Sequence, residues 1–366
     1  MKRRQLLVYA SIVPLAPAEY ARAAIKNVVD SVPVAGRITT PVVAAPSISA
    51  SQMLQGLLQQ HLVPSAMALV QAAQALAQSL TQQLTQPHSA KPWAQHQPLW
   101  VNTMLAWERL AAVAVGPLLE RRSARAIDFW PTRPTQIQRL LDAGTITTVQ
   151  QLDTVGTTAR GLPALEWLLW KTNGGGHATV YASLLAQQVE IESTLLLAGY
   201  QALLSTEWDD AEAWSVYGDW FGQAVGGLDQ LRIKKMVLGT RGKDSAPWVR
   251  GLSGHTADAW LAQAEGLQAF LVGSPAVQAT TQAKSPGWPV PGSLNSLLLG
   301  RGHLDHSQTL IERTAAMMRA VQAARPGNAA SVRAAQAALA QVSALASTLA
   351  GDVLSISLGF TDADGD

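Results

Sequence analysis

The sequence predicts an all-α protein. Stretches rich in Ala, Leu and Gln recur with the spacing of helices, and almost no alternating strand pattern or hairpin signal is found. A charged content of 14% and an apolar content of 48% are typical of helices that pack closely on one another. The chain contains no cysteine, which excludes disulfides, thiolate metal sites and cysteine nucleophiles. Its stability must therefore come from its core.

Five stretches carry the helical pattern, and glycine and proline separate them. We expect helices within 51–86, 100–122, 178–205, 256–272 and 307–350. Breaks are predicted at Gly116-Pro117, at 130–134, at 173–176, at Gly226-Gly227 and across 273–300. The Ala-rich end of the last stretch, 328–350, keeps an apolar stripe at helical spacing, which favours a packed helix over a disordered tail.

The N-terminus predicts export. Residues 1–23 combine a basic start, a short apolar stretch and the small residues Ala21 and Ala23 at the positions that a signal peptidase reads. We therefore expect a signal peptide over 1–23, a mature chain over 24–366 and a location in the periplasm or cell envelope. Arg3-Arg4 followed by two leucines also resembles a twin-arginine signal, so the export route stays open between the general and the twin-arginine pathways.

The charge of the mature chain argues against a nucleic-acid partner. The predicted signal peptide removes four basic residues and one acidic residue, which changes the formal net charge from +2 to −1. No long cluster of Lys or Arg remains. No later segment reaches the run of about 18 to 20 uncharged apolar residues that a membrane anchor needs.

Glu166 is the leading candidate functional residue. It is the only charged residue within 161–170, and its neighbours at helical spacing are apolar. Removing a carboxylate from water is costly, so it must meet a cation, a metal ion or several hydrogen-bond donors, or bind a proton. The alternative is a structural carboxylate near the positive end of a helix dipole, paired with Arg125, Arg133 or Arg160.

Four segments, taken in order, carry a resemblance to a known family. They are Trp107 with Gly116-Pro117, Ile127-Asp-Phe-Trp-Pro131 with Arg139-Leu-Leu141, the segment 161–169, and the segment 357–366. Their order resembles the imelysin family of bacterial cell-envelope proteins, which is named for an insulin-cleaving peptidase and is associated with iron uptake. The resemblance implies two packed helical bundles with a site between them. We place the division of 24–366 near residue 206.

The family motif is incomplete in this chain. The resemblance implies a Gly-x-His-x-x-Glu signature, whose His and Glu project from one helix face and can share a metal ion. Gly161 and Glu166 match this signature, but Pro163 occupies the His position and offers no lone pair. Proline also suits the first turn of a helix, with Gly161 or Leu162 as the cap. Peptidase activity is therefore not expected.

Three further residues are candidates for the same site. Asp128 and the two aromatics that follow it precede a chain turn, and Asp128 supplies either an acceptor near Glu166 or a cap for the next turn. Arg250 and Ser253 look similar to a Trp-Arg-Ser element of the family, and they supply a cation and a hydroxyl to the cleft or form a surface turn.

Other motifs are better explained structurally. His303 and His306 have metal-like spacing but precede a helix, where Asp305 or Ser307 would act as a cap. His177 and His255 are lone histidines. The acidic C-terminus lacks the later Glu of a calcium loop, and neither Gly-x-Ser-x-Gly nor His-Glu-x-x-His is present.

The sequence thus predicts a periplasmic imelysin-like protein, not a peptidase, that binds a divalent or ferric metal ion or a small ligand between two bundles. Glu166 would be the principal acceptor, with Asp128, Arg250 and Ser253 beside it. Two alternatives stay open. One is a metal-dependent peptidase in which a distant histidine completes the site, and the other is an interaction module whose partner belongs to an envelope iron-uptake system.

Overall fold

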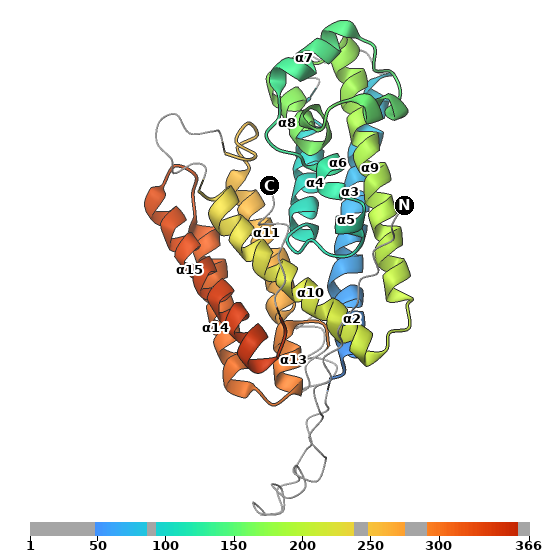
Figure 1. Ribbon diagram of the computed structural model, residues 1–366. Helices are drawn as coiled ribbons and strands as arrows, with labels where there is room; N and C mark the ends of the chain where they lie inside the picture. The colour runs from blue at the N-terminus through green and yellow to red at the C-terminus, as the bar shows by residue number, and fades with distance from the viewer. Residues whose placement is uncertain (1–47, 86–92, 238–247, 275–290, 358–366) are drawn as a thin grey trace, which may run out of the picture. The chain divides into compact units, whose positions relative to one another are not determined.

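Helices form all the regular secondary structure of the described residues, 48–85, 93–237, 248–274 and 291–357, in the computed structural model (Figure 1). The all-α prediction is confirmed. The long helices are α3 (Val63–Gln83), α4 (Gln97–Leu110), α9 (Gly176–Leu204), α10 (Asp210–Asp229), α11 (Thr256–Val272), α14 (Leu304–Ala323) and α15 (Ala329–Thr348). Shorter helices are α2 (Ala50–Leu57), α5 (Pro117–Glu120), α6 (Ser123–Ile127), α7 (Pro134–Ala143), α8 (Gly161–Lys171) and α13 (Leu294–Gly300).

Two types of irregular helix join these elements. The 3-10 turns η2 (Val149–Thr154) and η3 (Thr157–Ala159) lead into α8. The π-helical turns are η1 (Leu58–Leu62), η4 (Gln230–Lys235) and η6 (Leu349–Val353). Two of the π-helical turns, η1 and η4, supply polar side chains to the sites described below.

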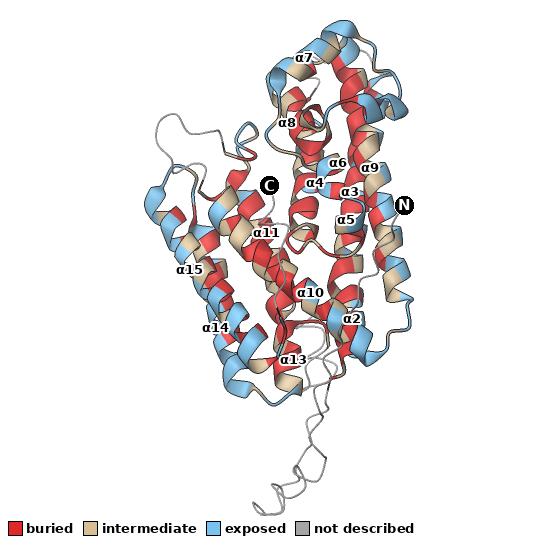
Figure 2. Ribbon diagram, viewed as in Figure 1, coloured by how far each residue is buried: buried red, intermediate tan, exposed pale blue. Residues whose placement is uncertain are grey.

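The helices pack in two groups that share a core. In the first group α9 and α4 lie against α3, and α8 lies against α9. In the second group α14 packs on α15 and α11, and α10 packs on α15. Contacts of α4 with α11 and of α2 with α10 join the groups, and the buried stripes of the helices face one another (Figure 2). Buried side chains from both groups form one continuous apolar cluster.

The predicted break at Gly226-Gly227 is wrong, because α10 continues through both glycines to Asp229. Their role is close packing. A Cβ atom at Gly227 would lie 2.1 Å from the carbonyl oxygen of Ala112, just beyond the end of α4. A side chain here would push these backbones apart, so glycine is required inside a helix where it usually lowers stability.

Other boundaries follow the sequence more closely. Helix α11 coincides with the predicted stretch 256–272, and α8 ends before the triple glycine from which α9 begins. Within 100–122, α4 ends at Leu110, and the short helix α5 begins at Pro117, where the sequence predicted a break. The Ala-rich segment forms α15, whose buried side chains include Val332, Leu339 and Val342.

No helix in the described ranges is both long enough and apolar enough to cross a membrane. The predicted signal peptide, 1–23, and the acidic C-terminal residues from 358 onward lie outside the described residues. The proposed division near residue 206 falls between α9 and α10 and stays a prediction.

We expect Gly227→Ala to lower the free energy of unfolding by about 1–3 kcal/mol, because the added methyl group overlaps the Ala112 carbonyl. Gly222→Ala in the same helix is the matched control, since its Cβ would meet nothing within 4 Å. Gly222→Ala should be neutral or stabilise by up to about 1 kcal/mol through helix propensity. Urea unfolding of both variants measures the difference, and equal effects would contradict the close approach.

Candidate functional site

Gly161 brings the start of α8 against the end of α6. Its φ is +69°, in the region that favours glycine, and a Cβ there would lie 2.2 Å from the carbonyl oxygen of Ile127. Gly161 therefore permits a backbone contact that places Asp128, the residue after Ile127, near α8. Arg160, one residue before the predicted cap positions, is the N-cap of α8.

Glu166 is buried on α8 with 4% of its surface exposed. Its Oε1 accepts two hydrogen bonds from Ser253, one from the backbone N–H at 2.9 Å and one from the hydroxyl at 2.7 Å. Among the described residues Glu166 forms no ion pair within 4.0 Å. The donors that touch this carboxylate are thus neutral, and its charge is balanced only from a distance.

Arg250 lies at the centre of a buried charge network. It is 1% exposed and has φ +62°, an unusual backbone conformation for a residue with a large side chain. Its Nη2 is 2.7 Å from Asp128 Oδ1 and 3.1 Å from Glu108 Oε1. Burial lowers the pKa of Arg250, but Asp128, Glu108 and Glu166 together raise it above its ordinary value. The guanidinium stays charged and attracts all three carboxylates.

Three more contacts fix the network. Lys235, from the π-helical turn η4, places its Nζ 2.5 Å from Glu108 Oε2. The indole N–H of Trp107 donates to Asp128 Oδ2 at 2.8 Å. The Arg250 guanidinium carbon lies 5.8 Å from the ring centroid of Trp100, at a distance where a cation is attracted by the aromatic face.

The network does not balance its own charge. With all groups ionised it holds three carboxylates, Glu108, Asp128 and Glu166, against the two cations Lys235 and Arg250. At the same time the Nε and Nη1 atoms of Arg250 are buried without a hydrogen-bond partner among the described residues. With these groups ionised, the described network therefore carries one uncompensated negative charge, and the two unpartnered nitrogens of Arg250 have three unused N–H groups between them.

The structure brings together the four residues that the sequence predicted for the site: Asp128, Glu166, Arg250 and Ser253. It corrects their alternatives. Arg250 lies in a turn, and the next residues Gly251 and Leu252 are exposed, but the Arg250 side chain itself is almost wholly buried. Asp128 caps no following helix, because its carboxylate contacts Trp107 and Arg250 and the N-cap of α7 is Arg133.

The arginines suggested as partners of Glu166 do not take that role. Arg125, Arg133 and Arg160 form no ion pair with Glu166 in the described structure, and Arg160 instead donates to the Leu152 carbonyl at 3.0 Å. Pro163 is buried in the first turn of α8, as its sequence position suggested. Glu166 itself lies in the second turn, beyond the free N–H groups of the helix start.

The remaining histidines do not complete a metal site. The rings of His303 and His306 meet edge to face at 5.9 Å, and no group of three or more potential metal-ligating side chains occurs in the described ranges. His303 is the N-cap of α14 but makes no side-chain cap, and the Ser307 hydroxyl donates to Asn295, so the cap predicted from Asp305 or Ser307 is wrong. His177 contacts the carbonyl of Leu141, and His255 contacts Asp258.

Sequence reasoning missed Glu108 and Lys235. Glu108 precedes Arg109 in α4, and an adjacent pair of opposite charges is typical of a solvated helix face. Its burial was signalled only by its position beside Trp107, which the family resemblance had singled out. Lys235 lies in a basic run, and nothing in that run distinguishes it from Lys234.

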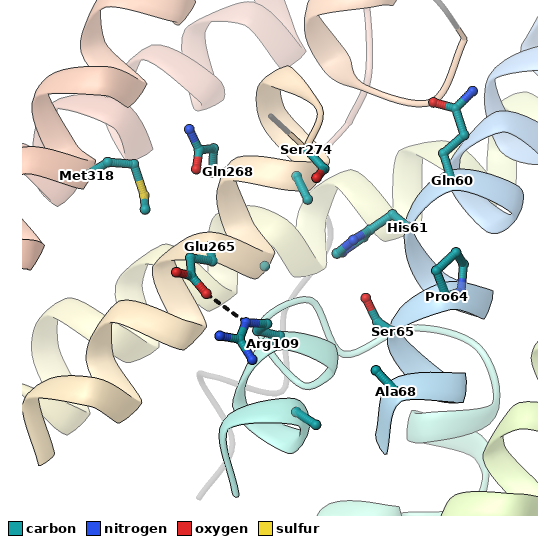
Figure 3. Close-up of a pocket in the computed structure, with 13 residues that line it drawn as sticks. Gln60, His61, Pro64, Ser65, Ala68, Arg109, Glu265, Gln268, Ser274 and Met318 are labelled. Atoms are coloured by element: carbon teal, nitrogen blue, oxygen red, sulfur yellow. Dashed lines mark hydrogen bonds and ion pairs between the residues drawn. The ribbon is translucent and has the colours of Figure 1, made fainter. Parts of the chain in front are cut away.

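A separate cavity of about 400 Å³ lies between η1, α3, α4, α11 and α14 (Figure 3). Its polar wall includes Arg109 and Glu265, whose side chains pair at 2.6 Å between Nε and Oε2. His61, from η1, points into it and is 7% exposed, and its Nε2 finds no hydrogen-bond partner among the described residues. Burial lowers the pKa of His61 from 6.5 to about 4, so the ring is neutral at neutral pH.

Comparisons with known proteins agree with the fold. The Imelysin model of peptidase family M75 matches residues 62–350. An imelysin-like protein from Psychrobacter arcticum 273-4 has a TM-score of 0.68 and 17% identity, over 87% of this chain and 100% of that chain. A putative iron-regulated protein A precursor from Parabacteroides distasonis ATCC 8503 has a TM-score of 0.68 and 12% identity, over 85% and 96% respectively. No curated protein matches the chain.

We expect Arg250→Met to lower the free energy of unfolding at pH 7 by about 3–5 kcal/mol, because it leaves Asp128 without its cation and Glu108 with Lys235 alone. Arg232→Met is the control, since its ion pair with Asp229 is about one-third exposed and should contribute less than about 1 kcal/mol. Chemical denaturation measures both. A small loss in Arg250→Met would show that the network does not need its central cation.

His61 should make stability depend on pH. Its pKa is about 4 when folded and 6.5 when unfolded, so the unfolded chain binds more protons between these values. The contribution of the neutral His61 ring to the free energy of unfolding is fully present above pH 6.5. It falls by up to about 3 kcal/mol as the pH drops to 4. We expect His61→Gln to remove this part of the pH dependence in urea unfolding. A difference between the two proteins that stays constant from pH 7 to pH 4 would contradict the burial of a neutral ring.

Proposed function

Because the chain belongs to the imelysin family, we propose that it is an exported cell-envelope protein that binds a metal cation at the Glu166 network and is not a peptidase. The observation that carries this proposal is the charge of the network. Three carboxylates face two cations, and Glu166 is the carboxylate with no cation in contact among the described residues. A further positive charge next to Glu166 would bring the site to neutrality.

The donor set argues for binding and against catalysis. A catalytic zinc site commonly has three protein ligands, often including histidine. Here Pro163 occupies the position at which the family resemblance implies histidine, and no group of three or more potential ligand side chains is found in the described part of the chain. The residues present thus fit a cation that obtains only part of its coordination from the protein.

The chemistry of these residues favours cations that prefer oxygen. Glu166 offers carboxylate oxygen, and the described network contains no histidine or sulfur ligand. Carboxylates suit hard cations, whereas imidazole and thiolate select zinc and copper. The unused N–H groups of Arg250 can donate to an oxygen of a small molecule that accompanies the cation. A metal ion carried with an oxygen-rich ligand would supply a cation to Glu166 and hydrogen-bond acceptors to Arg250.

Two further observations support an envelope role related to iron. Residues 1–23 carry the pattern of a signal peptide, which predicts export to the periplasm. The similar protein from Parabacteroides distasonis is described as a putative iron-regulated protein A precursor. We therefore propose ferric iron as the first cation to test, with an iron-uptake system as the setting.

The test is isothermal titration of the mature protein with ferric citrate, ferrous, zinc and copper ions. We expect ferric iron to bind and Glu166→Gln to abolish its binding, because the amide keeps an oxygen for Ser253 but removes the charge. Glu207→Gln, at an exposed position, is the matched control and should bind like the wild type. No binding of any ion, or equal binding by Glu166→Gln, would reject the metal site.

The same metal-loaded protein is then incubated with an unfolded polypeptide, with and without a chelator. We expect no chelator-sensitive cleavage, since the motif lacks its histidine. Cleavage that the chelator stops and that Glu166→Gln lacks would instead favour a metallopeptidase whose ligands include a residue outside the network.

A further inference from the structure

The ion pair in the cavity lined by His61 presents both charges to the same space. Arg109 from α4 and Glu265 from α11 contact through one atom each, Nε and Oε2. The two terminal nitrogens of Arg109 and the second oxygen of Glu265 form no hydrogen bond with the described residues. Their side chains are 44% and 37% exposed, so both remain accessible to a ligand. In Figure 3 the pair lies on the wall of the cavity opposite Ser65.

His61 is the second, independent sign of a ligand. A buried ring nitrogen without a partner costs free energy, and such groups normally find a partner in the protein or in bound water. His61 is more than nine-tenths buried and lies on a π-helical turn, a feature frequent at functional sites. Because its ring is neutral, it can donate one hydrogen bond and accept another without adding charge to the cavity.

We propose that this cavity binds a small zwitterion, a free α-amino acid, whose carboxylate is held by Arg109 and whose ammonium is held by Glu265. The volume of about 400 Å³ lies in the range of small-molecule sites, about 300–1,000 Å³. Met318, Pro64 and Ala68 supply apolar walls for a side chain.

The charges of the cavity select this class of ligand. Arg109 and Glu265 cancel, and the other polar lining groups, among them Gln60, Ser65 and Gln268, are uncharged. A simple carboxylate would face Glu265 as a like charge, and a simple amine would face Arg109. A zwitterion places each of its charges against the opposite one and leaves the cavity neutral.

The inference is independent of the Glu166 network. Glu108 and Arg109 are neighbours on α4, but Glu108 belongs to the buried network and Arg109 lines this cavity. Each site can therefore fail alone, and the two sets of measurements distinguish the failures.

The experiment measures binding of glycine, L-alanine, L-leucine, L-glutamate and L-lysine to the mature protein by isothermal titration. We expect saturable binding of at least one of them and none of alaninamide or N-acetylalanine, each of which lacks one of the two charges. Arg109→Gln and Glu265→Gln should each weaken binding about tenfold or more. His61→Gln should also weaken binding, whereas Glu207→Gln, the control at an exposed position, should have no effect.

Circular dichroism is used to check that each variant is folded. If Arg109→Gln does not fold, the binding measured for Glu265→Gln and His61→Gln tests the proposal. Absence of binding by every amino acid at millimolar concentration would overturn the proposal. Equal binding of alaninamide or N-acetylalanine, or undiminished binding by both Glu265→Gln and His61→Gln, would also overturn it. Amino-acid binding without metal binding would reject only the proposed metal site, and the reverse result would reject only the zwitterion site.

Discussion

The arrangement of the site depends on the burial of one guanidinium. Arg250 contacts Asp128 after α6 and Glu108 on α4, and its charge is felt by Glu166 on α8. Three separate segments thus converge on one cation, and without it Asp128 and Glu166 would have no cation near them among the described residues, while Glu108 would keep only Lys235. A buried pair of this kind adds little net stability over an apolar core, but losing one partner is costly. The interaction therefore fixes which segments meet more than it strengthens the fold.

Helix α4 connects the two polar regions of the molecule. Glu108 belongs to the buried network, whereas the next residue, Arg109, lines the cavity between the helix groups. Each region also receives a side chain from a π-helical turn, Lys235 from η4 and His61 from η1. The turn η1 joins α2 directly to α3, and η4 directly continues α10, so in both places the widened backbone redirects a polar side chain toward the interior without a break in the helix.

Much of the fold was predictable from helical spacing, and the site only in part. The single carboxylate of α8 was identified because charge in an apolar context is visible along the chain. Asp128 and Arg250 were identified through their family-like positions. Glu108 was not identified, because Arg109 follows it in sequence, and only the packing of other elements over Glu108 determines that it is buried. The helix break predicted at Gly226-Gly227 was wrong for a similar reason, since a glycine that breaks a helix and a glycine that admits a neighbouring backbone look alike in sequence. His61 gave no local signal, because a π-helical turn has no clear sequence pattern.

The π-helical turn η1 also sets the register of the first helices. An α-helix advances about 100° per residue, so a turn that accommodates one extra residue shifts the face that precedes it by that angle. Met53, Leu54 and Leu57 are buried in the core with this offset in place. Deleting a single residue within 58–62 would restore ordinary helix geometry while rotating the apolar stripe of α2 toward solvent. One residue in η1 thus decides, through a rotation of about 100°, which side of α2 faces the core.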